Sequence, residues 1–305
     1  MTRHSRAAGR PADVATTADA VSVIIPVWNG AATLSALLES LERQTYDGPC
    51  EVVAADNGSS DGSRSLLSGW SRRIAGLRVV DASGRRGTCH ARNAGARAAR
   101  GWLLAFIDQD EEADPGWLRA LVEASGSAPL LAGRYDVRRL NGPLALYWNI
   151  GRDPEDRPPQ RLGFLPHAPG GSLAIEAEVL RRVGGWDERF RGGGEDVDLS
   201  WRVQLAGYPL RFVPGAIVHH RQRDRLPSLA RQKFFYGMTR VRLYKRYRSL
   251  LPPQHRFGSF KSVVVIALNA GDLLRSPARR GRWIASAATR LGRLVGSVRE
   301  GVFYP

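Results

Sequence analysis

The chain has 305 residues, of which 43% are hydrophobic and 24% are charged. This is the composition of a globular protein with one large domain or two smaller ones, and it excludes a disordered chain and a fibre. Two cysteines, Cys50 and Cys89, cannot build a disulfide framework. No charged segment followed by an apolar one opens the chain, so we expect a cytoplasmic rather than a secreted protein.

The positive charge is concentrated at the end of the chain. The whole sequence carries 45 Lys+Arg against 29 Asp+Glu, a net charge of +16. Residues 1–220 hold 26 basic and 26 acidic side chains, whereas residues 221–305 hold 19 basic and 3 acidic ones. This asymmetry predicts an anionic partner for the last segment, either a membrane face or nucleic acid, with a solvated basic surface as the plain alternative.

The first hundred residues alternate between strand and helix patterns. Residues 1–19 lack apolar periodicity and are predicted to form a disordered leader. A β-branched run at 21–27 is followed by a turn and by leucines at helical spacing, and the same order recurs after the strands predicted at 50–55 and 77–81. A fourth strand is predicted at 102–107. This alternation predicts an α/β fold with a mostly parallel sheet covered by helices on both faces.

The second half of the chain is less regular. A further strand is predicted at 130–137, and the Pro- and Gly-rich segment 141–171 predicts long loops. Helix patterns return at 177–183 and 196–205. An apolar run then ends in two histidines. No uninterrupted run of about 20 apolar residues predicts a transmembrane helix.

Polar side chains gather where the predicted parallel strands end. Trp28 follows the first strand, Asp56 the second, and Asp108 and Asp110 the fourth. Because the carboxyl ends of parallel strands meet at one edge, we expect these side chains to share a crevice. Two carboxylates in a D-x-D triplet can hold a divalent cation that also binds diphosphate oxygens. Acidic residues also crowd ordinary turns, so the position of the triplet matters more than its composition.

Three glycines precede two acids, Glu195 and Asp196, at the predicted start of a helix. A helix N-terminus stabilises a carboxylate through its dipole and its unpaired amides, so Asp196 could be only a helix cap. Three consecutive glycines give a flexible backbone that allows close approach of other groups, which is more than a cap requires. This favours a functional role for the acids.

Six motifs, taken in order, resemble those of glycosyltransferase family 2. They are VSVIIPVWNG, VVAADNGSSDGS, GTCHARNAGARAARGWLLAFIDQD, GGSLAI, GGWDERFRGGGEDVDLSWRVQLAGY and AIVHH, spread over residues 20–222. The resemblance implies the GT-A fold and an inverting transfer that depends on Mn²⁺ or Mg²⁺. A sugar would move from a nucleotide-diphospho-sugar donor to a hydroxyl of a glycan or lipid-linked acceptor, in cell-envelope or polysaccharide biosynthesis.

The resemblance also assigns donor-side roles to individual residues. Pro26, Trp28 and Asp56 match the positions that hold the nucleotide base, and Trp28 stands where the family more often has Tyr. The nucleotide-sugar pocket would be lined by further cationic and polar side chains, namely Arg92, Asn93, Asp108 and, as a second cation near the leaving diphosphate, Arg86.

The remaining roles concern the metal, the proton and the acceptor. Asp110, with Asp108 and His220, matches the metal site, and His219 is the neighbour expected to face the core. Asp196 matches the family's catalytic base, which must lie within hydrogen-bond distance of the acceptor hydroxyl, and Glu195 is the rival. Trp186 matches an acceptor-side position, with a plain core tryptophan as the equal alternative.

Beyond residue 222 the resemblance fades. Aromatic and basic side chains are interleaved over 231–248, and from Trp283 onward apolar residues follow helical spacing on one side with arginines elsewhere around the helix. This pattern resembles an interfacial amphipathic helix, and packing on the catalytic domain is the alternative. We therefore expect a GT-A domain at 20–222 and a basic helical extension at 223–305, peripheral on the inner face of the cell membrane.

Two other hypotheses compete with this one. Arginine supplies 42 of the 45 basic residues and binds phosphate bidentately, which suits diphosphate-linked lipids, but aromatics among arginines could also stack on nucleic acid bases. No recognised nucleic-acid module accompanies them, so nucleic acid is the less favoured partner. A catalytically silent protein on the same fold is the alternative to an enzyme, and the intact Asp108, Asp110 and Asp196 argue against it.

Overall fold

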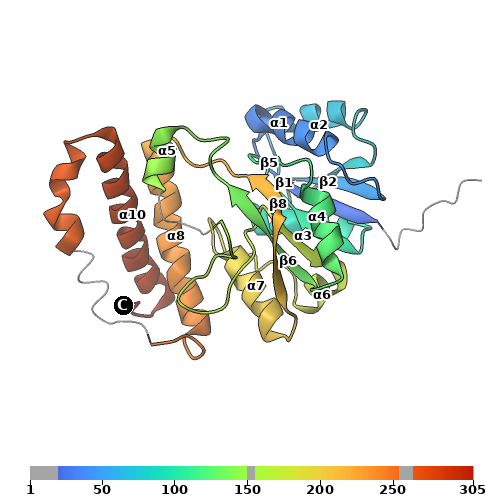
Figure 1. Cartoon of the computed structure of the whole chain (residues 1–305). Coiled ribbons are helices and arrows are strands. Elements are labelled where there is room, and N and C mark those ends of the chain that lie inside the picture. Colours follow the sequence, from blue (N-terminus) through green and yellow to red (C-terminus); the bar gives the residue numbers. More distant parts are fainter. Residues whose placement is uncertain (1–19, 150–154, 254–263, 305) are drawn as a thin grey trace, which may run out of the picture.

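The structure is a computed structural model that describes residues 20–149, 155–253 and 264–304. The predicted leader at residues 1–19 lies outside the described residues. Figure 1 shows a twisted sheet with helices packed on it and, beside it, a group of long helices from the end of the chain. The eight strands are β1 Val21–Val27, β2 Cys50–Asp56, β3 Leu77–Asp81, β4 Leu103–Phe106, β5 Glu112–Ala113, β6 Leu130–Asp136, β7 Leu173–Glu176 and β8 Leu210–His219.

The sheet has the strand order β3-β2-β1-β4-β7-β6-β8-β5. Its first half is parallel, because β1 pairs in parallel with both β2 and β4, and β2 with β3. The second half is mixed, since β7 runs antiparallel to both β4 and β6, while β6 and β8 are parallel. The α/β fold and the early strands are confirmed. The sequence did not predict β5 or β7, which are short and lie in a region without regular strand–helix alternation.

Alternation along β1 divides the interior into two cores. Val21, Val23 and Ile25 face a core that also contains side chains of α1 (Ala31–Glu42), α2 (Ser63–Trp70) and α4 (Trp117–Ser125). Ile24 faces the opposite core, where α6 (Ala177–Arg182) and α7 (Glu195–Leu205) pack. Helix α3 (Thr88–Ala98) lies against the parallel half of the sheet, where its Ala91 packs in a small alanine cluster. Helices therefore cover both faces, as expected.

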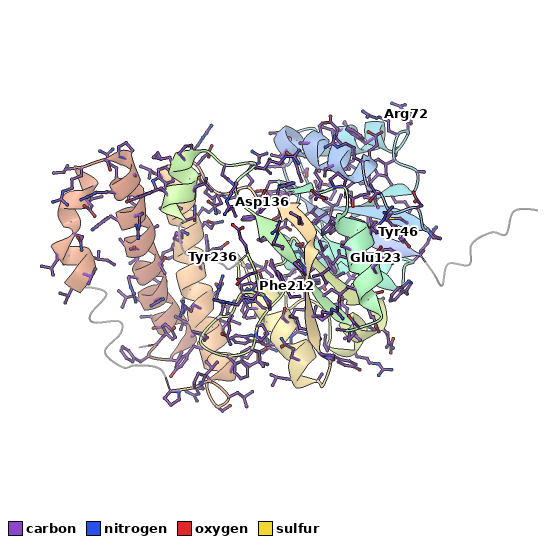
Figure 2. All side chains as sticks on the ribbon, viewed as in Figure 1. Tyr46, Arg72, Glu123, Asp136, Phe212 and Tyr236 are labelled. Carbon is purple, nitrogen blue, oxygen red and sulfur yellow. The ribbon has the colours of Figure 1, made fainter. Side chains whose placement is uncertain are left out.

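The second core continues into the C-terminal extension. Helix α8 (Leu226–Tyr247) contributes Val241, Leu243 and Tyr247 to it, and the Tyr247 ring packs edge-on against Trp201 of α7 with centroids 5.0 Å apart. Figure 2 labels Tyr236 on the side of α8 that faces the sheet. The predicted boundary at residues 222 and 223 therefore does not coincide with a break in packing.

The last long helix, α10 (Pro277–Glu300), runs beside α8 (Figure 1). The two helices approach closely through glycines, because a Cβ atom added at Gly237, Gly292 or Gly296 would meet backbone atoms of the other helix. The short helix α5 (Pro143–Trp148) packs against the first turns of α10, where the Trp148 indole N–H donates to the Pro277 carbonyl over 3.1 Å.

The contact through glycines leaves the larger apolar side chains of α10 outside. Leu291, Leu294 and Val298 are 55%, 63% and 84% exposed, and we call these three residues the apolar stripe. The helix predicted from Trp283 onward is confirmed, but its apolar side is not packed on the sheet domain. None of the helices in the described part of the chain combines the length and apolarity needed to cross a bilayer.

Candidate active site

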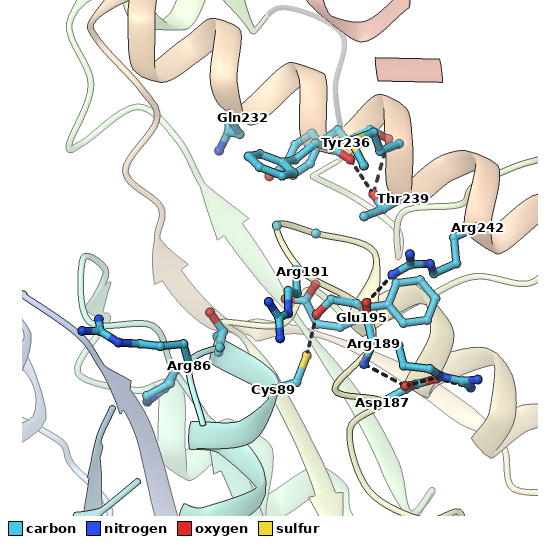
Figure 3. A pocket seen from close by; sticks show the side chains of 18 of the residues that line it. Arg86, Cys89, Asp187, Arg189, Arg191, Glu195, Gln232, Tyr236, Thr239 and Arg242 are labelled. Atoms are coloured by element: carbon cyan, nitrogen blue, oxygen red, sulfur yellow. Dashed lines mark hydrogen bonds and ion pairs between the residues drawn. The ribbon is translucent and has the colours of Figure 1, made fainter. Parts of the chain in front are cut away.

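A cleft of about 1510 Å³ lies between the carboxyl ends of β1 and β4 and the side of α8. Among the described residues, ten basic side chains line it against five acidic ones, so it carries an excess of positive charge that suits an anionic ligand. Figure 3 shows Arg86 to one side of Glu195 and Arg242 to the other, with Tyr236 and Thr239 of α8 above. The cleft thus joins the predicted donor residues to the C-terminal extension.

Arg92 is the buried cation at the centre of the site. Its guanidinium, 2% exposed, donates to Asp108 Oδ1 over 2.7 Å and to Glu195 Oε1 over 3.0 Å. It also lies 4.5 Å from the ring centroid of Trp186. Helix α3, the segment just after β4, and α7 each supply one of the three charged groups, so the fold brings together residues far apart in sequence. Arg92 and Asp108 line the cleft, as predicted.

The two acids at the start of α7 have different partners. Glu195 lines the cleft and pairs with Arg92 through one carboxylate oxygen, while the other, Oε2, is buried and accepts no hydrogen bond from the residues that the structure describes. The Asp196 carboxylate accepts from the backbone N–H of Val197 over 2.8 Å and of Gly170 over 3.4 Å. Burial raises the pKa of both acids, and the Arg92 charge opposes that rise. Both are therefore poised to hold a proton more readily than ordinary carboxylates.

Glu111, which the sequence did not single out, organises His220. Its buried carboxylate lies 2.7 Å from His220 Nδ1 and accepts the backbone N–H of Asp108 over 3.2 Å. The Tyr135 ring stacks on the imidazole with centroids 4.4 Å apart. Burial lowers the pKa of His220, but the Glu111 hydrogen bond and charge outweigh it and hold the pKa above its usual value. Glu111 follows the D-x-D triplet directly, but adjacency alone does not reveal a partner more than a hundred residues away.

The GGSLAI motif has a packing role in this arrangement. A Cβ atom at Gly171 would collide with the Glu111 carboxylate, so only glycine lets this loop pass over the acid. The backbone N–H of Gly171 donates to the Tyr135 hydroxyl over 2.9 Å. The loop therefore supports both the His220–Glu111 pair and, through Gly170, the Asp196 carboxylate.

Each predicted metal ligand has another partner in the structure. Asp108 pairs with Arg92, Asp110 accepts from Arg223 over 3.0 Å, and His220 pairs with Glu111. Among the described residues, no three His, Cys, Asp or Glu side chains converge on one cation position. The donor chemistry does fit a divalent cation, because carboxylate oxygens are available and the Glu111 contact at Nδ1 leaves His220 Nε2 as the ligating nitrogen.

The predicted nucleotide-base side of the cleft is tied together by Gln109, the middle residue of D-x-D. Its amide accepts the Trp28 backbone N–H over 2.7 Å and donates to the Trp28 carbonyl over 3.0 Å. The Trp28 ring is half exposed, and the Arg86 guanidinium lies 5.2 Å from its centroid. Pro26, Trp28 and Arg86 line the cleft together. The exposed ring is available to stack on a ligand.

Asp56 lies at the end of β2, beside the end of β1, and is 2% exposed. Its carboxylate accepts the backbone N–H of Ser59 over 3.1 Å. The next residue, Asn57, lines the cleft and uses its amide to hold the loop before α3, since it accepts the Gly87 N–H over 2.8 Å. Sequence reasoning did not select Asn57.

Two predicted site residues have structural rather than ligand-facing positions. Trp186 is 1% exposed and packs edge-on against Phe106 with centroids 5.1 Å apart, so its ring offers no face to an acceptor. The prediction that it stacks on an acceptor is corrected to the alternative of a core tryptophan. The Asn93 amide is fully used within the protein, because it donates to the Trp186 carbonyl and to Glu188 and accepts the Trp186 N–H. His219 is buried and bonds Asp136, as expected of the core-facing neighbour.

The three glycines before α7 lie directly under α8. Their φ angles are +84°, +124° and +81°, in the region that side-chain-bearing residues avoid. A Cβ atom at Gly193 would lie 2.6 Å from the Tyr236 ring. The glycine loop therefore has both the backbone conformation and the close helix contact that require glycine, and α8 forms one wall of the site.

The sheet and the acids at its strand ends define the class of fold: a GT-A nucleotide-sugar transferase fold. Solved structures agree. A mannosyltransferase of Pyrobaculum calidifontis in complex with GDP-Man and Mn²⁺ superimposes with a TM-score of 0.64 at 21% identity, over 93% of this chain and 90% of that one. GalNAc-T7 with UDP, GalNAc and Mn²⁺ gives a TM-score of 0.55 at 21% identity, over 80% of this chain and 53% of that one.

The chain belongs to glycosyltransferase family 2. The pattern of Glycosyl transferase family 2 matches residues 22–183, and that of Glycosyl transferase family group 2 matches residues 160–287. Relatives include the pre-mycofactocin glycosyltransferase of Mycobacterium tuberculosis, 28% identical over 91% of this chain and 55% of its own length. The validoxylamine A glucosyltransferase of Streptomyces hygroscopicus is 31% identical over 62% of this chain and 52% of its own length. The chain spans about half the length of these two relatives.

Proposed function

We propose that the chain transfers a sugar from a nucleotide-diphospho-sugar to an acceptor hydroxyl, with inversion at the anomeric carbon. The observation that carries this proposal is the Arg92 bridge, which joins the first D-x-D aspartate, Asp108, to Glu195 at the start of α7 in one cleft. The named activities of the relatives and the nucleotide sugars bound by neighbours of the same fold support it.

The donor would lie across the strand ends. Pro26 and the exposed Trp28 ring, which line the cleft, would contact the nucleotide base, with Asp56 at the neighbouring strand end. The diphosphate would lie toward Arg86 and Arg92. Cationic side chains at this point offset the negative charge that develops on the leaving nucleoside diphosphate.

A divalent cation, Mn²⁺ or Mg²⁺, would be held by Asp110 and His220 with Asp108 nearby. When bound, such an ion neutralises diphosphate oxygens and makes the diphosphate a better leaving group. Glu111 would keep the His220 ring oriented, and Arg223 would release Asp110 to take a ligand. The Mn²⁺ in the neighbouring structures supports a divalent ion.

Asp196 would act as the catalytic base. Its carboxylate takes the proton from the acceptor hydroxyl as that oxygen attacks the anomeric carbon and the bond to the diphosphate breaks. The backbone N–H groups of Val197 and Gly170 orient the carboxylate, and burial favours its accepting a proton. Glu195 would instead hold Arg92 in position.

The acceptor would be a glycan or a lipid-linked molecule of cell-envelope or polysaccharide biosynthesis, met at the inner face of the cell membrane. The apolar stripe of α10 supports membrane contact, since exposed leucines beside an excess of arginines suit an anionic leaflet. In vesicle flotation, the Leu294→Ser/Val298→Ser variant should lose binding, whereas Leu144→Ser/Leu205→Ser, at exposed sites on other elements, should keep it. Equal binding by both variants would contradict membrane contact through the stripe.

Transfer itself is tested by screening nucleotide sugars for Mn²⁺-dependent thermal stabilisation and then assaying turnover of the donor that binds. Turnover should stop with a chelator and fall at least about a hundredfold in Asp110→Ala, because the diphosphate loses a metal contact. The control, Asp47→Ala, removes a carboxylate that is 98% exposed and should leave turnover unchanged. Full turnover in the presence of chelator would contradict the metal role.

A further inference from the structure

Three arginines meet between α8 and α10, and none of them has an acidic partner among the described residues. Arg240, Arg290 and Arg293 gather around Tyr304, and we call them the arginine cluster. The Arg240 Nε donates to the Tyr304 hydroxyl over 2.8 Å, and the Arg293 guanidinium lies 5.3 Å from the centroid of the same ring. Tyr304 itself is buried. The cluster is thus a fixed group of cations around one aromatic ring.

The cluster is only partly satisfied within the protein. Arg290 Nη1 and Arg293 Nε are buried and have no hydrogen-bond partner in the described part of the chain. Burial and the charge of Arg240 lower the pKa of Arg290, and burial with both neighbouring arginines lowers the pKa of Arg293 to about 10. No described carboxylate acts on either pKa, and the nearby Glu300 already pairs with Arg242 over 2.7 Å. The three guanidinium groups carry the same positive charge, so they repel one another.

The cluster is separate from the catalytic cleft. Residues of α10 that line the cleft include Arg299 and Glu300, whereas none of the three clustered arginines is among the described lining residues. On the surface of α10, Arg290 neighbours Leu294 of the apolar stripe at the i, i+4 spacing. The uncompensated cations therefore border the exposed apolar side chains.

We propose that Arg240, Arg290 and Arg293 bind the phosphate of an anionic lipid headgroup at the edge of the apolar stripe. This inference rests on the membrane contact proposed above. The three arginines are half-buried, so a phosphate could accept hydrogen bonds from their accessible N–H groups and offset three like charges. A stripe inserted at the boundary between headgroups and acyl chains would place the neighbouring Arg290 at the level of the lipid phosphates. A free phosphate ion would satisfy the arginines but would leave the exposed leucines without a role.

The anion site is tested first without lipid. We expect inorganic phosphate to raise the Tm of the full chain above its value in chloride of equal ionic strength. In Arg290→Met/Arg293→Met the Tm in chloride should rise, because like-charge repulsion is relieved, and part of the phosphate response should be lost. The control Arg279→Met/Arg282→Met removes two exposed arginines from the same helix and should keep the full response, including any part due to the cleft. If Arg290→Met/Arg293→Met keeps the full rise in Tm with phosphate, the proposal is overturned.

The lipid source is tested with vesicles of phosphatidylcholine and phosphatidylglycerol. Wild-type protein should float with them, and the Arg290→Met/Arg293→Met variant should bind about tenfold more weakly than the control pair, which has lost the same charge. Equal loss in both pairs would overturn the headgroup site while leaving the membrane contact intact. Phosphate could raise the Tm of the wild-type protein, and not that of Arg290→Met/Arg293→Met, while the wild-type protein does not float with vesicles. That result would contradict a lipid headgroup as the ligand and would also contradict the proposed membrane contact.

Discussion

Arg92 and Asp108 are joined by a 2.7 Å ion pair although they belong to different elements, α3 and the end of β4. The guanidinium is almost fully buried, and its second bond to Glu195 extends the link to α7. A buried cation between two acids is costly to disturb, because any single change leaves a charge without its partner. The site is therefore both a chemical centre and a junction of the fold.

Arg92→Met should destabilise the protein by about 3–5 kcal/mol, since Asp108 and Glu195 would lose their common counter-charge. Urea unfolding followed by circular dichroism measures this change. The control is Arg86→Met, an exposed cation of the same cleft, which should change the unfolding free energy by less than about 0.5 kcal/mol. Equal stabilities of the two variants would contradict the bridging role.

Gly193→Ala should lower both stability and transfer. The residue has φ +124°, and an added Cβ would lie 2.6 Å from the Tyr236 ring, so the loop before α7 must move. We expect a loss of about 2 kcal/mol in thermal or urea unfolding. Gly207→Ala is the matched control, because its φ is +90° but its Cβ would meet nothing within 4 Å. The difference between the two variants isolates the contact with α8. No difference would show that α8 does not constrain the loop.

The pH dependence of transfer should report the Asp196 environment. A base acts only when deprotonated, so the rate should fall as pH drops through a pKa that burial has raised above that of an ordinary aspartate. The Arg161 charge lowers this pKa. In Arg161→Gln the acidic limb of the kcat/KM profile should therefore move to higher pH. Arg157→Gln, an exposed arginine beside Asp156, should leave the limb in place. A shift to lower pH in Arg161→Gln would contradict the assignment.

A chain that ends at Gln222 should not fold. It would lack Tyr247, whose hydroxyl donates to the fully buried Asp198 over 2.8 Å, and Arg246, which pairs with the same carboxylate over 2.9 Å. Its second core would also be open where Val241 packs. We expect a molten or aggregated product by near-UV circular dichroism, whereas a chain ending at Leu251 should retain cooperative unfolding. Cooperative unfolding of the shorter chain would contradict the shared core.

The sequence predicted the local parts of the site better than their connections. The strand ends at Trp28, Asp56 and Asp108 could be predicted from apolar runs and from the alternation of strands and helices, because both patterns involve residues that are neighbours in sequence. The pairing of Glu111 with His220 could not be predicted in the same way, since it depends on which strands become neighbours. The sequence left Trp186 between an acceptor-side and a core position for a related reason: a motif position does not say whether a ring faces a ligand or the core.

The extension shows the same limit. Helical periodicity correctly located α10, but its apolar residues do not face the sheet domain, because the glycines at 237, 292 and 296 decide which side of the helix meets α8. Glycines contribute little to a hydrophobic pattern, so the sequence pattern identified the exposed apolar stripe and did not identify the face of α10 that contacts α8. The uneven charge of the last segment was visible from counting alone.

The proposed role of Asp196, removal of the proton from the acceptor hydroxyl, is tested by comparing Asp196→Asn with Glu195→Gln under saturating donor. Asparagine keeps the shape of the side chain and, through its one amide oxygen, the short contact with the Val197 N–H, so Asp196→Asn should bind donor as wild type does but transfer sugar at least about a thousandfold more slowly. Glu195→Gln should lose less transfer and more stability. Wild-type transfer rates in Asp196→Asn would contradict the account.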